Sequence, residues 1–210
     1  MDTEIRRPLE SFKQAITIIF GLTLTNAIMV LLTRGTYSKI YAIYDLSFCD
    51  IFICLILIVN CLRFYHGNMK SVAIEYKLYL NKESSGRWLF TDISVFFIQI
   101  MILSVMSFYI YNFNLYLTIY LILLAVDVVW GASKYIFLKL KQAKGEKVHK
   151  EPHVYFRWSL INVIFGVAIF FAWTDGIYGN ILYFLLVVNT FLDFCINWKY
   201  YIPIQTVAVE

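Results

Sequence analysis

Residues 116–137 read YLTIYLILLAVDVVWGASKYIF, an apolar run with one acid, Asp127, near its centre. The run is long enough to cross a bilayer, because a helix rises about 1.5 Å per residue and the hydrocarbon core is about 30 Å thick. A charged side chain facing lipid is costly, so we expect Asp127 to face protein or water and never lipid. The run therefore predicts a transmembrane helix with a polar residue turned inward.

Five further apolar runs accompany this one, at residues 14–32, 46–65, 88–109, 158–173 and 181–201. Of the 210 residues, 60% are hydrophobic and only 15% are charged, a balance typical of helical membrane proteins and outside the range of soluble domains. Short loops leave no room for a separate globular domain. We therefore predict an all-α, polytopic membrane protein with six transmembrane helices in a single domain over residues 1–210.

The loops indicate how the chain crosses the membrane. Lysine and arginine are concentrated in the amino terminus, in residues 66–87 and in residues 139–157, whereas the turns near positions 112 and 176 have none. Because cytoplasmic loops are enriched in these residues, we expect three helical hairpins with both termini in the cytoplasm. The exit run RFYHGNMK and the spacing of apolar residues after it predict a separate amphipathic helix on the membrane surface at about 68–81.

The three hairpins resemble one another. Aligning Arg87-Trp88 with Arg157-Trp158 places Asp92 opposite Asn162, and a second alignment places Asp127 opposite Asp193. Asn60 has the corresponding place in the first hairpin. An internal repeat explains these matches, and so does chance alignment of apolar helices with similar flanks. In the first span, Thr17, Gly21 and Thr25 recur every fourth residue, which predicts a close helix contact on that face.

Several polar residues lie at similar predicted depths, in the middle or the cytoplasmic half of the spans. Three of these residues are acids, Asp92, Asp127 and Asp193, and only one, Arg63, is a cation. At least one acid therefore has no cation to pair with and must stay protonated or meet water. One hypothesis is a polar cavity open to the cytoplasm; the alternative is that these groups are hydrogen-bonding contacts between helices. The predicted lining residues are Asp127, Asp193, Asn189, Asp92, Arg63, Asn60 and Asn162.

No catalytic, phosphate-binding or metal-binding motif accompanies these residues, so we predict no catalytic residue, no metal and no cofactor. The cysteines, at positions 49, 54, 61 and 195, lie in apolar runs without a C-x-x-C pair, and we interpret them as reduced packing residues. The net charge of +4 resides in loops between spans, which favours lipid head groups over nucleic acid as partners.

These features favour a small channel or transporter that forms a homo-oligomer. The alternative is a membrane-embedded sensor, effector or scaffold that binds a soluble cytoplasmic protein through its basic loops. Abundant Ile, Phe, Tyr, Asn and Lys suit a bacterial gene of low G+C content, hence a bacterial inner membrane. The residues predicted to contact lipid or a partner are Arg63, His66, Lys141, Lys144 and Lys147.

Overall fold

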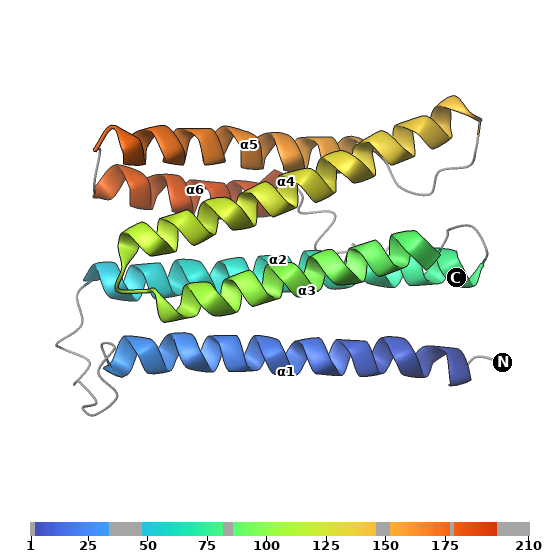
Figure 1. Cartoon of the computed structure of the whole chain (residues 1–210), viewed down its shortest axis with the longest axis horizontal. Helices are drawn as coiled ribbons and strands as arrows, with labels where there is room; N and C mark the ends of the chain where they lie inside the picture. The colour runs from blue at the N-terminus through green and yellow to red at the C-terminus, as the bar shows by residue number, and fades with distance from the viewer. Residues whose placement is uncertain (1–2, 34–47, 82–85, 146–151, 177–178, 197–210) are drawn as a thin grey trace, which may run out of the picture. The chain divides into compact units, whose positions relative to one another are not determined.

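The chain is all-helical in its computed structural model, which describes residues 3–33, 48–81, 86–145, 152–176 and 179–196 (Figure 1). This part of the chain contains six helices. They are α1 (Thr3–Thr33), α2 (Phe48–Leu80), α3 (Gly86–Phe108), α4 (Phe113–Ala143), α5 (Pro152–Thr174) and α6 (Asn180–Ile196). The all-α prediction is confirmed.

Five of the helices are long and apolar enough to cross a membrane. They are α2, α3, α4, α5 and the segment Glu10–Thr33 of α1. Length and composition thus support a multi-pass membrane protein. The sixth predicted span, 181–201, coincides with α6, whose apolar segment Asn180–Leu192 is shorter than a span, and residues 197–201 lie outside the described residues. The sixth crossing stays a prediction.

The chain divides into two compact units, Met1–Asp127 and Val128–Glu210. The first contains α1, α2, α3 and the beginning of α4; the second contains the rest of α4, α5 and α6. Each is described below by itself, and the single domain predicted over residues 1–210 stays a prediction.

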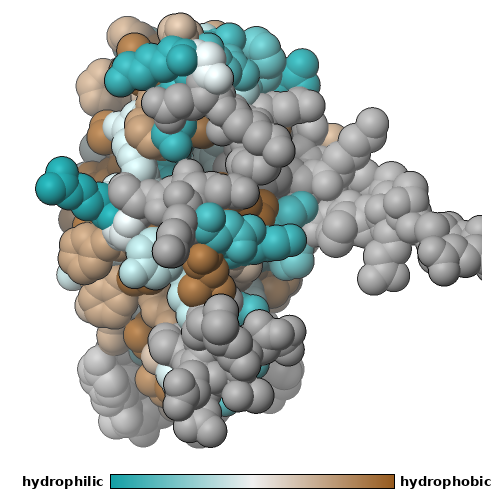
Figure 2. Space-filling model, turned by 90° about the vertical axis from the view of Figure 1, so that its right-hand side faces the viewer, coloured by the Kyte–Doolittle hydropathy of each residue, from teal (hydrophilic) through white to brown (hydrophobic). Residues whose placement is uncertain are grey.

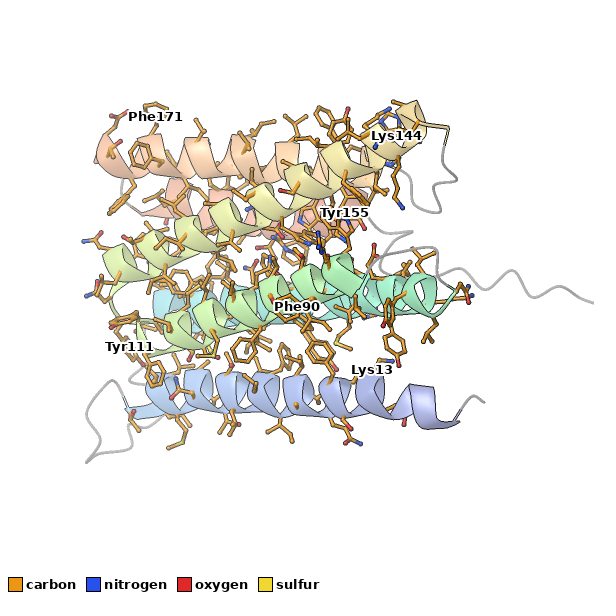
Figure 3. All side chains as sticks on the ribbon, turned by 45° about the vertical axis from the view of Figure 1, so that its right-hand side comes forward. Lys13, Phe90, Tyr111, Lys144, Tyr155 and Phe171 are labelled. Atoms are coloured by element: carbon orange, nitrogen blue, oxygen red, sulfur yellow. The ribbon has the colours of Figure 1, made fainter. Side chains whose placement is uncertain are left out.

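In the first unit, α1 packs against α2 and α3, and α2 packs against α3 (Figure 1). Thr23 Oγ1 and Ser104 Oγ are 2.5 Å apart, and Asn26 Nδ2 donates to Ser107 Oγ at 2.6 Å. Near the end of α1, the Tyr111 hydroxyl donates to the Leu31 carbonyl oxygen (Figure 3). These pairs are 80 or 81 residues apart in sequence, so α1 and α3 run parallel.

The face that α1 turns toward its neighbours differs from the predicted one. Gly21 and Thr25 are exposed, and a Cβ added to Gly21 would meet nothing within 4 Å. The buried positions are Ile16, Phe20, Thr23 and Ala27, and of the predicted stripe only Thr17 makes a contact, 2.7 Å from the Tyr65 hydroxyl. Within the described residues, α1 therefore contacts α3 through Thr23 and not through the predicted stripe. A contact of the stripe with another molecule stays a prediction.

Helix α2 corrects a second prediction, since residues 68–81 form no separate surface helix. The helix continues from Phe48 to Leu80 without a break, and Asn68, Met69 and Val72 are buried. Histidine, glycine and asparagine in succession are typical of a helix end, but packing against α3 overrides this local tendency. At the other end of the unit, α4 begins where Asn112 Oδ1 accepts from the Leu115 amide at 3.2 Å, as a helix cap does.

In the second unit, α5 packs against α6, and α4 approaches α5 closely at Gly131. A Cβ at Gly131 would collide with the Ser159 hydroxyl unless that hydroxyl moved, so the two helices approach closely there. Trp130 meets the rings of Tyr155 and Trp158 edge-on, with centroids 5.6 and 5.8 Å apart. The core of this unit is thus an aromatic cluster beside one close helix contact.

Candidate functional site

Buried polar side chains occupy one end of the first unit, where α2 ends and α3 begins. We call this end the polar half: Asn68, Ser71 and Glu75 of α2, Asp92 and Gln99 of α3, and Asp127 of α4. Each of these six residues is at most 5% exposed. Figure 2 faces the end of the chain at which α1 and α3 begin and shows hydrophilic residues among apolar ones.

Helix periodicity brings these residues together. Asn68, Ser71 and Glu75 are three or four residues apart, so they share one face of α2, and Asp92 and Gln99 share one face of α3 because they are two turns apart. Phe96, one turn from both Asp92 and Gln99, is buried on the same face. The faces of α2 and α3 that meet are therefore polar here, although both helices are apolar enough to cross a membrane.

A chain of amide and carboxyl groups connects three helices. Asn68 Nδ2 donates to Gln99 Oε1 at 2.6 Å, and Gln99 Nε2 donates to Asp127 Oδ1 at 2.9 Å. All three side chains are at least 98% buried. Gln99 thus uses both ends of its amide, one toward α2 and one toward α4.

A second link joins α2 to α3 one turn away. Ser71 Oγ donates to Asp92 Oδ2 at 3.1 Å. Asn60, near the middle of α2, donates instead to the carbonyl oxygen of Ile56 in its own helix, at 2.9 Å. Two of the acids predicted from sequence, Asp92 and Asp127, therefore accept hydrogen bonds from neighbouring helices.

The buried charge of the first unit is mainly negative. Glu75, Asp92 and Asp127 are buried acids, and Arg63 is fully buried in the middle of α2. Burying an ionisable side chain costs free energy unless hydrogen bonds or an opposite charge offset the loss of water. Apolar packing alone therefore does not explain why these four residues are buried. Among the described residues, no group of three or more His, Cys, Asp or Glu is arranged to hold a metal ion.

The second unit holds two more of the predicted lining residues. Asn162 of α5 and Asn189 of α6 are buried, at 1% and 0% exposure. Asp193 lies in α6, but its side chain is outside the described residues. Lys134 of α4 is also buried, at 1% exposure.

The predicted lipid or partner contacts divide into three groups. His66 and Lys144 are exposed, and Lys141 is partly exposed beside the Phe137 ring. Lys147 lies outside the described residues. Arg63 corrects the prediction, because a side chain with no exposed area cannot contact a partner at the surface. The cysteines are also split: Cys54 and Cys61 pack inside, whereas Cys49 and Cys195 are exposed.

Four residues of the polar half were not predicted as lining residues: Asn68, Ser71, Glu75 and Gln99. The first three lie in the stretch that we predicted to be a surface helix. We therefore interpreted their spacing of three and four residues as that of a helix lying on the membrane. Continuing the periodicity of α2 through Gly67 would have placed them on the buried face with Phe64. For Gln99 the signal was its position two turns after Asp92 on one face of α3.

The fold and these residues define a class, the helical multi-pass membrane proteins that bury a polar cluster between spans. Comparisons with protein-family models, curated proteins and solved structures give no match.

Proposed function

We propose that the protein is a small channel or transporter whose solute path passes through the polar half. The observation that carries this proposal is the burial of Asp92 and Asp127 at hydrogen-bonding distance from side chains of neighbouring helices. Ionisable residues inside membrane helices are rare, and ion or solute pathways are among the sites that they mark. Arg63 and Glu75 add two further buried ionisable groups, both on α2.

The competing explanation is that these residues only hold the helices together. Hydrogen bonds between membrane helices contribute about 0.6 kcal/mol on average, which a simple packing role would account for. Asp127→Asn separates the two explanations, because the introduced amide keeps an oxygen that can accept from Gln99 Nε2 while the charge is lost.

The test measures voltage-driven flux of H⁺, Na⁺, K⁺ and Cl⁻ in liposomes that contain the purified protein. We expect Asp127→Asn to assemble normally and to reduce the flux of the transported ion at least tenfold. Ser133→Ala is the matched control on the same helix, because Ser133 is exposed and bonds only back to the Val129 carbonyl oxygen. Equal flux in wild type, control and Asp127→Asn would reject the proposal.

The proposal includes a topology of three hairpins with both termini in the cytoplasm of a bacterial cell. Exposed Lys144 directly follows the end of α4, and the uncharged turn at Asn112 precedes its start. This difference in charge supports opposite sides of the membrane for the two ends of that helix. Single cysteines introduced at positions 112 and 144 should react with an impermeant reagent from outside and inside the cell, respectively.

The proposal also includes self-association. The described spans bury less than half of their most apolar windows within one chain, which leaves most of each surface for lipid or another copy. Mass measurement in detergent micelles tests this expectation, and a monomer at all concentrations would contradict it.

A further inference from the structure

We infer that Asn68 and Gln99 are positioning residues for Asp127, acting as a hydrogen-bond chain of fixed direction. The inference rests on the proposed function only where it predicts an effect on flux. The hydrogen-bond chain itself is inferred from which atoms donate and which accept. Asn68 gives a hydrogen to Gln99, and Gln99 gives a hydrogen to Asp127, at 2.6 and 2.9 Å.

The direction follows from the last link, in which Asp127 Oδ1 accepts from Gln99 Nε2. Gln99 therefore turns its NH₂ group toward Asp127, and only the carbonyl oxygen of its amide is left to accept a hydrogen bond. Its carbonyl oxygen then points to α2 and requires a donor, which the amide of Asn68 supplies. One acceptor on α4 therefore determines how the amides on α3 and α2 are turned.

The consequence is that the effect of a substitution at position 68 depends on which residue occupies position 127. A carboxylate at position 68 has no hydrogen to give to Gln99 Oε1. Gln99 could satisfy it only by reversing its amide, which would set the Gln99 oxygen against Asp127 Oδ1. The hydrogen-bond chain therefore accommodates one acid, at position 68 or at position 127. The position of that acid determines which way the Gln99 amide is turned.

This reasoning predicts a rescue. Asn68→Asp alone leaves two buried acceptors facing each other, whereas Asn68→Asp combined with Asp127→Asn moves the acid to the other end. Gln99 then donates to the carboxylate at position 68 and accepts from the amide at position 127. All links are restored with the direction reversed. A role in filling space would give no such rescue, because Asn and Asp have nearly the same shape.

The experiment compares melting temperatures of the full-length protein in detergent for the wild type, both single variants and the double variant. We expect Asn68→Asp to lower the melting temperature by about 4–10 °C, because it leaves two buried acceptors facing each other. The double variant should recover at least half of the loss. Additive losses in the double variant would overturn the inference.

Asn60 provides the matched control. It is buried on the same helix, but its amide donates to the Ile56 backbone rather than to Gln99. Combining Asn60→Asp with Asp127→Asn should give no recovery relative to Asn60→Asp. Equal recovery in this pair would show that only the number of buried acids matters and would overturn the inference.

A second pair covers the case in which Asn68→Asp does not fold. Gln99→Glu replaces the donor toward Asp127 by an acceptor, and we expect it to be unstable. Adding Asp127→Asn supplies a hydrogen from position 127, while Asn68 still donates from the other side. Recovery of folded protein in this double variant supports the chain, and failure of both double variants rejects it.

Flux measured on the same proteins distinguishes this inference from the proposed function. We expect the rescued Asn68→Asp/Asp127→Asn protein to be folded but to transport at least tenfold less than the wild type, because the acid has moved to α2. Rescue with normal flux in Asp127→Asn would retain the chain and reject the function. Loss of flux in Asp127→Asn with additive melting temperatures would retain the function and reject the chain.

Discussion

The two ends of the first unit are built from the same three helices and have opposite interiors. Beyond Asn60 and Arg63 toward the start of α2, most buried residues are apolar or aromatic, and Ser107 near the end of α3 is a buried polar exception. The apolar and aromatic ones include Ile53 and Leu57 of α2, Ile110 in the α3–α4 turn, and Tyr116, Leu117 and Tyr120 of α4. We call this end the apolar half. At the other end the polar half contains carboxylates, amides and a hydroxyl. Apolar packing joins the helices in one half, and hydrogen bonds between buried side chains join them in the other.

The first prediction places an acid in the apolar half, where we expect the largest effect. Leu57 is fully buried and lies eleven residues before Asn68, three turns away on the same face of α2. Leu57→Asp should cost more than about 3 kcal/mol, because it loses the packing of leucine and buries an acid among apolar side chains. Yield of folded protein and melting temperature in detergent measure the effect. A wild-type yield would show that the two halves are equally tolerant of charge.

The second prediction makes the reverse change in the polar half. Gln99→Leu removes the donor of Asp127 and the acceptor of Asn68 together, so two buried polar groups lose a partner. We expect a loss of about 2–3 kcal/mol, measured by thermal unfolding in detergent. Ile100→Leu, at the neighbouring buried position of α3, is the control and should cost less than about 1.5 kcal/mol. A stability gain from Gln99→Leu would mean that the hydrogen-bond chain of Asn68, Gln99 and Asp127 destabilises the fold relative to apolar packing.

The helices and the inward direction of Asp127 could be predicted from sequence, because hydropathy and the cost of charge in lipid depend on one segment at a time. The partners could not, since the Gln99 amide bonds to residues 31 positions before and 28 positions after it. The polar part of α2 was misassigned for a related reason. His66 and Gly67 favour a helix end locally, and only contacts with α3 show that the helix continues.

The third prediction concerns polar contacts beside the apolar half. Thr23 of α1 contacts Ser104 of α3. Helix α1 contributes no residue to the polar half, which is formed by α2, α3 and α4. Thr23→Val keeps the shape and removes this hydrogen bond, so we expect a loss of about 0.6 kcal/mol. Thr25→Val on the exposed face of the same helix should change stability by less. If both variants match the wild type, polar contacts outside the polar half contribute nothing measurable.

The fourth prediction concerns Gly21, where we expect a gain in stability rather than a loss. The open space around it accommodates a methyl group, and alanine favours the helix, so Gly21→Ala should raise stability by up to about 1 kcal/mol. Gly131→Ala is the contrasting variant, because its methyl group requires the Ser159 hydroxyl to move in the second unit. Gly131→Ala should therefore raise the melting temperature less than Gly21→Ala does. A loss at Gly21 would indicate that another molecule occupies that face.

The length of α2 has a mechanical consequence. Its 33 residues extend about 50 Å, and a tilt of about 20° still leaves it longer than a hydrocarbon layer of about 30 Å. Part of the helix therefore projects beyond the lipid tails, and the polar half lies toward one end of it. Bilayer thickness then sets how many of these polar groups lie at the depth of the acyl chains. Lipids with shorter or longer tails should tune the protein without any change in its sequence.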